Sequence, residues 1–335
     1  MSEADKRKQR VAWLSVVSNT TLVLLKITVG LLIGSVSVIS EAIHSAVDLV
    51  AAVIALLAVR TSSQPADQKH PFGHGKAENI SGAIEALLIF GAAAWIIHEA
   101  VRKLSHPEPL EAIGWGVGVM FLSSAVNILV SQMLFQVGRE TDSVALEADA
   151  WHLRTDVYTS AGVMAGLGLI WAGERFFPDL NLVWLDPAAA LIVALLIIKA
   201  AYDLTVKSAR DLMDASLPVE EIKLIREHID AFSPQVRGFH RLRTRKSGAQ
   251  RFVEFHLLVD AGMSVDESHR ITDQVAGALE EHYPDLSVTI HIEPCHGDCE
   301  PECEDGCLLD KNDRHAVRTG RRWPDGPAGP RPRPA

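Results

Sequence analysis

The residues that could do chemistry form one short pattern that occurs twice. Residues 41–48 read EAIHSAVD and residues 149–156 read DAWHLRTD, so each copy has an acid, an alanine, a histidine and a final aspartate at matching positions. A separation of four residues puts the histidine and the final aspartate on one helix face, one turn apart. Two such faces would offer two imidazoles and two carboxylates, a set that suits zinc. We call these candidate ligands the quartet: His44, Asp48, His152 and Asp156.

The elements that must position the quartet are apolar. Of the 335 residues, 48% are apolar and 22% are charged, and the apolar residues gather in long blocks before position 205. A bilayer core needs roughly 20 apolar residues per helix. The sequence therefore predicts six membrane spans, at about 11–33, 36–60, 80–101, 112–137, 143–172 and 183–205.

The quartet would then lie at membrane depth, in the second and fifth spans. Ionisable groups at that depth cost a few kcal/mol each and normally face a partner or an aqueous cavity. A plainer interpretation is that these residues form helix–helix hydrogen bonds or lie at the membrane surface. The duplication of the motif favours a metal site.

The charges outside the spans predict an orientation and exclude one class of partner. Eight Lys and Arg residues flank the spans on the side of the N-terminus, against three on the opposite side. Basic flanks stay in the cytoplasm, so both termini, including the segment 1–10, are expected there, and the spans are expected in the lipid of the cell (inner, cytoplasmic) membrane. The formal net charge of −10 argues against a nucleic-acid partner.

After the spans, the sequence predicts a small cytoplasmic domain. Residues 218–232 and 264–283 have the pattern of helices, whereas 236–245, 251–260 and 286–293 alternate like strands. The order αββαβ is that of a two-layer, ferredoxin-like or metallochaperone-like α+β fold. The expected fold class is therefore an α-helical integral membrane protein with six transmembrane helices plus this C-terminal α+β domain.

The expected domains follow from these patterns. A transmembrane domain would cover 11–207 and a regulatory and dimerisation domain would cover 208–295. A tail over 296–335 is polar, and its end is too rich in Pro, Gly and Arg to pack, so we expect it to be disordered.

Six spans, the duplicated His-x3-Asp motif and the αββαβ domain resemble the cation diffusion facilitator family of divalent-metal/proton antiporters, over roughly residues 8–295. The resemblance implies that the quartet is the transport site and that the protein is a homodimer. Bacterial members often carry Asp at the position of His44, whose imidazole resembles the zinc-selective pattern. Imidazole suits zinc, whereas manganese prefers hard oxygen ligands.

A polar loop between the second and third spans holds three further candidate ligands, Asp67, His70 and His74. Their offsets of three and four allow them to converge in a tight turn. They would otherwise be ordinary solvated loop residues. The resemblance implies a second metal site here, with a structural role or a role in admitting metal, because the loop lies outside the membrane path.

The predicted cytoplasmic domain is rich in histidine. The period of two puts His291 and Glu293 on one face of the last strand. Scattered histidines are usually surface residues, but the segments that carry them resemble the regulatory domain of the family, where such histidines bind zinc near a dimer interface. Glu293 stands where Asp is common. The candidate regulatory ligands are His240, His256, His269, His291 and Glu293.

Two further groups of residues are predicted to have a role. Free thiols bind soft metals, so the tail cysteines, spaced by four, could collect metal or could be chance residues of an acidic tail. The resemblance also implies a pair between Lys76 and Asp214 that holds the dimer together. The tail cysteines are Cys295, Cys299, Cys303 and Cys307.

Together these patterns predict a homodimeric secondary transporter that exports Zn²⁺ in exchange for protons by alternating access, with Cd²⁺, Co²⁺ and Fe²⁺ as alternative cargo. The cytoplasmic domain would sense zinc, so zinc is both cargo and regulatory ion. One rival is a membrane-bound metalloenzyme, for which only Glu41 and Asp149 could supply a general base. A second rival is a membrane-anchored metal sensor, whose spans would need no ionisable residues.

Overall fold

The computed structural model describes residues 2–33, 36–105, 115–176, 184–283, 285–296 and 301–318. The chain divides into two compact units, Met1–Met213 and Asp214–Ala335.

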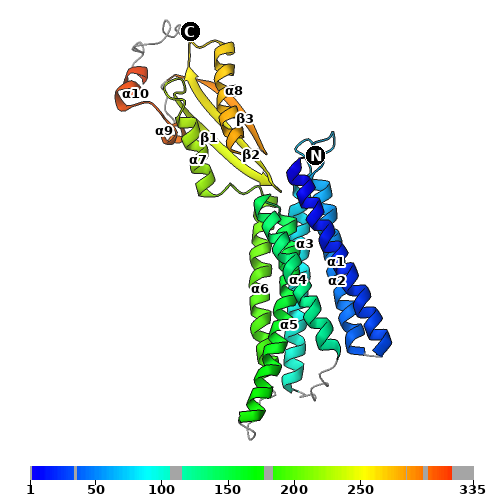
Figure 1. Ribbon diagram of the computed structural model, residues 1–335. Helices are drawn as coiled ribbons and strands as arrows, with labels where there is room; N and C mark the ends of the chain where they lie inside the picture. Colours follow the sequence, from blue (N-terminus) through cyan, green and yellow to red (C-terminus); the bar gives the residue numbers. More distant parts are fainter. Residues whose placement is uncertain are drawn as a thin grey trace. The chain divides into compact units, whose positions relative to one another are not determined.

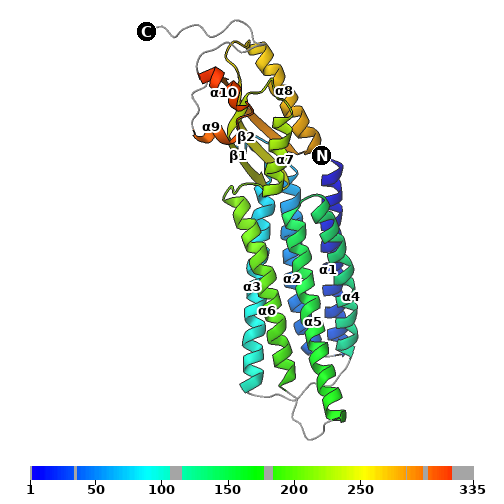
Figure 2. The ribbon, with the colours of Figure 1, turned by 90° about the vertical axis from the view of Figure 1, so that its left-hand side faces the viewer.

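The first unit is a bundle of six long helices that run side by side along a common direction (Figures 1 and 2). Helix α3 packs against α6, α1 against α2 and α4 against α5, and α5 also contacts α2, α3 and α6. Helix α5, which carries His152 and Asp156, therefore contacts four other helices. The six are α1 (Glu3–Ile33), α2 (Val36–Ser62), α3 (Lys76–Ser105), α4 (Trp115–Glu140), α5 (Val144–Phe176) and α6 (Leu185–Leu212).

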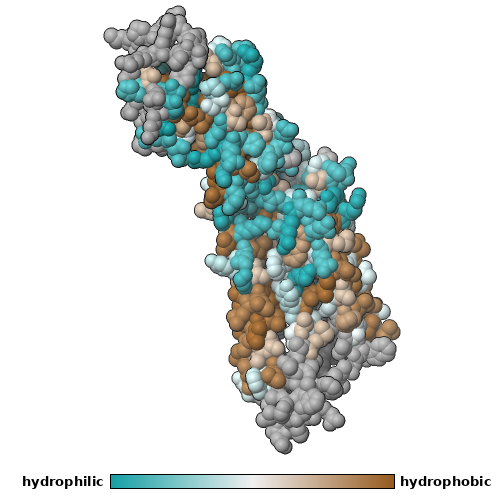
Figure 3. All heavy atoms as spheres, turned by 60° about the vertical axis from the view of Figure 1, so that its left-hand side comes forward, coloured by the Kyte–Doolittle hydropathy of each residue, from teal (hydrophilic) through white to brown (hydrophobic). Residues whose placement is uncertain are grey.

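This bundle has the apolar exterior of a membrane domain. Within the described residues, α1, α2, α3, α4 and α6 are each long and apolar enough to cross a membrane. Large apolar side chains such as Leu32, Leu87 and Leu195 are exposed on them, and Figure 3 shows apolar residues over part of the outer surface. Lipid solvates such a surface, and helices satisfy their own backbone hydrogen bonds there. The expected membrane bundle is confirmed.

The end of α6 differs from the sequence prediction. The helix continues beyond residue 205 to Leu212, and the two units divide at Met213 rather than at 207. Its last two turns are polar, so hydropathy misses them. They pack on α3, where Asn79 donates from Nδ2 to Oδ2 of Asp211 at 2.9 Å and a Cβ on Gly82 would lie 2.7 Å from Oγ of Ser208.

The second unit has the predicted αββαβ order, which is confirmed. Strands β1 and β2 are antiparallel, β2 and β3 are parallel, and the sheet order is β1-β2-β3. Alternate residues of β2, such as Phe255 and Leu257, are buried against Ile229 of α7 and Val275 of α8. The elements are α7 (Val219–Asp230), β1 (Gly238–Ser247), β2 (Gln250–Asp260), α8 (Val265–His282) and β3 (Leu286–Cys295).

The expectation of a disordered tail is wrong for residues 301–318, which form α9 (Pro301–Asp305) and α10 (Lys311–Arg318). Strand β1 is an edge strand, and its free backbone groups need partners. The backbone N–H of Phe239 donates to the carbonyl of Gly306 at 2.9 Å, and that of Leu308 donates to the carbonyl of Arg237 at 3.0 Å. A Cβ on Gly306 would lie 1.9 Å from the Phe239 oxygen, so this approach requires glycine. Residues 319–335 lie outside the described residues.

Candidate metal sites

The structure brings the quartet together where α2 and α5 pack. Nε2 of His152 lies 3.1 Å from Oδ1 of Asp48, and Nε2 of His44 lies 3.6 Å from Oδ1 of Asp156. Each pair joins the two helices. One ligand atom from each of His44, Asp48 and Asp156 lies within 4.8 Å of the others. Ligand atoms of tetrahedral zinc are roughly 3.3 Å apart, so a small contraction would bring these three atoms to the spacing of zinc ligands.

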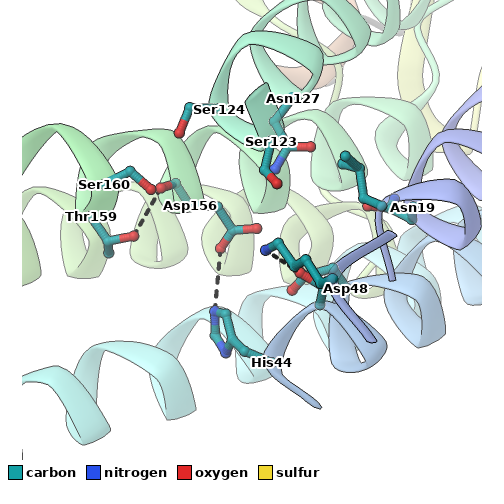
Figure 4. A pocket seen from close by; sticks show the side chains of 12 residues that line it. Asn19, His44, Asp48, Ser123, Ser124, Asn127, Asp156, Thr159 and Ser160 are labelled. Atoms are coloured by element: carbon teal, nitrogen blue, oxygen red, sulfur yellow. Dashed lines mark hydrogen bonds and ion pairs between the residues drawn. The ribbon is translucent and has the colours of Figure 1, made fainter. Parts of the chain in front are cut away.

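Three of the four quartet residues line a polar cavity of about 150 Å³ (Figure 4). His44, Asp48 and Asp156 contribute to its wall, and the rest of the lining is mostly polar. Such a cavity has room for an ion with several waters. The other lining residues include Asn19, Ser123, Ser124, Asn127, Thr159 and Ser160.

The quartet has a buried half and an open half. The side chains of Asp48 and His152 are 4% and 6% exposed, whereas those of Asp156 and His44 are 19% and 54% exposed. His44 and Asp156 are therefore the more accessible half of the quartet.

One lysine at this site was not assigned to it from the sequence. Lys26 of α1 is buried, lines the same cavity and donates from Nζ to Oγ of Ser45 at 2.7 Å. Lys26 and Asp48 both line this cavity. An ammonium group here partly balances the two aspartates when no metal is bound. The available signal was a lysine inside an otherwise apolar span.

The leading acid of the second motif, Asp149, does not join the quartet. Asp149 is fully buried and does not line the cavity at the quartet. The side chain of Glu41 lies outside the described residues.

The loop ligands converge within a single turn. Oδ1 of Asp67 accepts hydrogen bonds from the backbone N–H groups of Lys69 at 2.8 Å and His70 at 2.6 Å. These bonds, that of His70 first, hold the pKa of Asp67 below its usual value. Nδ1 of His70 and Nε2 of His74 lie 3.3 and 3.4 Å from its two oxygens. The left-handed φ of Gly73, 81°, permits the turn.

In the second unit, the pairing of the three strands brings another cluster of candidate ligands together. His240 of β1 pairs with His256 of β2, and His256 pairs with His291 of β3, so the three imidazoles form a row across the strands. Oε1 of Glu293 lies 2.8 Å from Nδ1 of His256, and Oε2 lies 2.9 Å from Nε2 of His240. The row occupies the sheet face opposite Phe255 and its buried neighbours. We call His240, His256, His291 and Glu293 the sheet site.

Electrostatics in the sheet site favour an ionised carboxylate. Partial burial raises the pKa of Glu293, but hydrogen bonds with His256 and then His240 outweigh it, and the pKa lies below its ordinary value. Nε2 of His291 lies 3.5 Å from Oε1 of Glu293, and its ring is 4.7 Å from that of His256.

The structure does not bring His269 to the sheet site. It lies on α8 with its side chain 71% exposed, and Nε2 is 3.7 Å from Oδ2 of Asp273.

The structure does not test the predicted pair between Lys76 and Asp214. Lys76 donates from Nζ to the carbonyl of Leu212 at 3.4 Å. Asp214 belongs to the other unit and lies 3.6 Å from Arg245, so its pairing with Lys76 stays a prediction.

The described tail cysteines do not form one metal site. Cys295 pairs with Asp260 at the β3 edge of the sheet, whereas Cys307 bridges to Gly238 beyond the β1 edge. Three strand spacings, roughly 14 Å, separate these positions, which is too far for one ion. Cys303 lies in α9, and Cys299 lies outside the described residues.

Comparison with known proteins agrees with both units. Residues 12–213 match the cation efflux transmembrane domain family, and residues 217–295 match the cytoplasmic domain of cation efflux proteins. A protein described as the uncharacterized transporter sll1263 of Synechocystis is 36% identical over 81% of this chain and 85% of its own length. The cation-efflux pump FieF of Klebsiella pneumoniae is 34% identical over 82% of this chain and 89% of its own length.

Among solved structures, the metal-bound C-terminal domain of the CzcD transporter from Thermotoga maritima is 30% identical over 25% of this chain and all of that chain, with a TM-score of 0.23. The family matches span both units of the chain, and the relatives are matched over most of their length. This chain is therefore a member of the cation diffusion facilitator family and a multi-pass membrane cation-efflux transporter.

Proposed function

We propose that this chain exports Zn²⁺ from the cytoplasm in exchange for protons, with the quartet as the transport site. Its family membership identifies a transporter rather than an enzyme, so the metalloenzyme alternative is set aside. The proposal concerns the cargo, the exchanged ion and the residues that carry them.

The observation that carries the proposal is the set of donors at the junction of α2 and α5. His44, Asp48 and Asp156 offer ligand atoms within 4.8 Å of one another beside a polar cavity, and His152 contacts Asp48 at 3.1 Å, so two imidazoles and two carboxylates meet at this junction. This mixed nitrogen and oxygen set favours zinc over manganese or magnesium, which prefer oxygen alone. Cd²⁺, Co²⁺ and Fe²⁺ are the alternative cargo that the same donors would accept.

Proton exchange follows from the chemistry of these donors. An imidazole must lose its proton before it binds metal, and a carboxylate must be ionised. Nε2 of His152 lies 3.1 Å from Asp48 and Nε2 of His44 lies 3.6 Å from Asp156, so each imidazole can hold a proton beside a carboxylate when no metal occupies these atoms. Protons from an acidic exterior would therefore compete with zinc for the same atoms and drive its release.

Two further proposals concern regulation and assembly. The sheet site would bind zinc and bias transport, and the loop site would hold or admit metal at the membrane surface. The cytoplasmic-domain family matched here supports a homodimer. The excess of basic residues on the side of the membrane that carries the N-terminus supports cytoplasmic termini and a place in the inner membrane.

The test is a flux measurement on purified protein in sealed proteoliposomes that contain a zinc dye and a pH dye. With an imposed pH gradient, zinc should move against protons, and dissipating the gradient with an ionophore should slow the zinc flux. Cd²⁺, Co²⁺, Fe²⁺ and Mn²⁺ are tested in parallel. Zinc flux that ignores the gradient would refute proton exchange, and no zinc flux with rapid flux of another ion would refute the cargo.

A further inference from the structure

A second cavity lies on the helical unit between α4 and α5. Its volume is about 620 Å³, it is open on one side, and it shares no lining residue with the cavity at the quartet. Its lining combines two arginines, Arg139 and Arg154, with the aromatic side chains of Phe135, Trp151 and Tyr158.

Both arginines are held on one aromatic ring. The guanidinium carbon of Arg139 lies 5.4 Å and that of Arg154 lies 5.9 Å from the centre of the Phe135 ring. Trp151 packs edge-on against the same ring, with 5.2 Å between centroids. Cation–π contacts of this length orient the charges, and they leave the N–H donors of the guanidinium edges available.

Within the described part of the chain, neither guanidinium has a carboxylate partner. Arg154 donates from Nε to the hydroxyl of Ser131 at 2.9 Å. The one carboxylate in the lining, that of Glu140, lies 2.5 Å from Arg7 and accepts a hydrogen bond from Gln136 at 3.0 Å. Arg139 and Arg154 therefore share a cavity whose carboxylate, that of Glu140, is already paired with Arg7.

The depth of Arg154 in the bundle makes its lack of a carboxylate partner informative. A Cβ on Gly138 would contact Leu146 and Glu147, which sets the antiparallel register of α4 and α5. Arg154 and its partner Ser131 then lie about two turns, roughly 10 Å, further from the helix ends than Gly138. The Arg154 side chain nevertheless reaches Phe135, one turn from the end of α4. A long basic side chain directed to the membrane surface in this way places its charged group among water and lipid headgroups.

We propose that Arg139 and Arg154 bind the phosphate of an anionic phospholipid headgroup. Planar guanidiniums make paired hydrogen bonds to phosphate oxygens, and basic pockets between membrane helices bind anionic headgroups. Trp151 and Tyr158 border the cavity and would contact the glycerol and upper acyl region of the same lipid. Because α5 also carries His152 and Asp156, a lipid bound here holds the outer face of the helix that contributes half of the quartet.

The test uses the full-length protein, stripped of lipid in detergent, with native mass spectrometry to count the lipids that are retained. Three additives are compared: phosphatidylglycerol, phosphatidylcholine with the same acyl chains, and inorganic phosphate. We expect about a tenfold preference for phosphatidylglycerol over phosphatidylcholine. The double variant Arg139→Gln/Arg154→Gln should lose that preference. The matched control Arg102→Gln/Lys199→Gln removes two exposed charges elsewhere on the bundle and should keep it.

Each outcome decides the proposal. A preference that is equal in wild type and in the double variant would refute it, and so would inorganic phosphate that displaces the lipid at equal concentration, since the site would then be one for free phosphate. Thermal melting checks that the double variant is folded. If it is not, Arg139→Gln alone alters only an exposed side chain, and it should weaken phosphatidylglycerol retention several-fold; unchanged retention in that variant would equally refute the proposal.

Discussion

The quartet and the sheet site both consist of imidazole and carboxylate groups, but the fold positions these groups in different ways. In the quartet, each helix supplies one histidine and one aspartate, and both contacts cross from α2 to α5. In the sheet site, adjacent strands fix three histidines through their backbone register. Packed helices can shift by an ångström or two while keeping their own hydrogen bonds, whereas a change of register would turn every strand side chain to the other face.

If both clusters bind zinc as proposed, this difference would separate a site that can release its ion from one that retains it. A small displacement of α5 against α2 would pull the quartet apart, as alternating access requires. The sheet site would keep its geometry through the same motion, because its donors belong to one sheet. The loop site resembles the sheet site in this respect, since eight consecutive residues, 67–74, contain all of its donors.

The largest expected effect comes from breaking the quartet. Asp48→Asn or Asp156→Asn keeps the side-chain shape but removes a charged ligand, so zinc flux in proteoliposomes should fall below about a tenth of wild type, which corresponds to roughly 1.4 kcal/mol or more. Asp203→Asn, an exposed acid on α6, is the matched control and should keep full flux. Either quartet variant with more than a tenth of the flux would mean that the transport site is wrongly assigned.

Breaking the sheet site should affect zinc binding strongly and maximal flux weakly. His256→Ala or Glu293→Ala removes a donor that contacts the others. Calorimetry on the second unit should therefore no longer detect its tightest zinc binding. Full-length protein should keep flux within about twofold at saturating zinc, but should need more zinc to reach it. His269→Ala is the control, because His269 lies outside the cluster. Equal loss of zinc binding in the control would show that the cluster needs α8.

His44 offers a subtler test, because it is the exposed member of the quartet. His44→Asp replaces a soft nitrogen by a hard oxygen, and the ratio of Mn²⁺ to Zn²⁺ flux should rise several-fold. The same histidine change in the loop, His74→Asp, should leave this ratio unaltered. An unchanged ratio in His44→Asp would remove His44 as the residue that tunes selectivity.

The smallest effect is a pH dependence in the sheet site. The pKa of Glu293 is lowered in the folded protein, so its contribution to stability is present above its ordinary value, about pH 4.5, and is lost as pH falls through the lowered pKa. The free energy of unfolding of the second unit should therefore fall more steeply on acidification than that of Glu293→Gln. The difference should be about 1 kcal/mol or less, as for other partly exposed pairs. Parallel pH curves would contradict the assigned contacts.

Much of this architecture could be predicted because it rests on local patterns. The repeated His-x3-Asp motif and the period-two alternation around Phe255 are visible in a few consecutive residues, and both correspond to helices and strands in the structure. Long apolar runs likewise predict the bundle. The row formed by His240, His256 and His291 needs strand register, which no single segment contains.

The parts that could not be predicted depend on contacts between distant residues. The polar segment 301–318 has too few apolar residues to suggest packing, yet residues 306–308 pair with the free edge of β1. Lys26 joins the quartet's cavity only because α1 packs beside α2. The even spacing of the tail cysteines suggested a single site, but β2 separates the strand that ends at Cys295 from the one that Cys307 meets.

The central claim, that α2 and α5 together hold the transported ion, is tested most directly by the coordination shell of bound zinc. X-ray absorption spectra would be recorded on full-length protein in which the loop and sheet sites are removed by His70→Ala/His74→Ala and His240→Ala/His256→Ala. The account predicts one zinc per chain with two imidazole nitrogens and two carboxylate oxygens, and loss of that zinc in Asp156→Asn. A shell without imidazole, or one that survives Asp156→Asn unchanged, would contradict it.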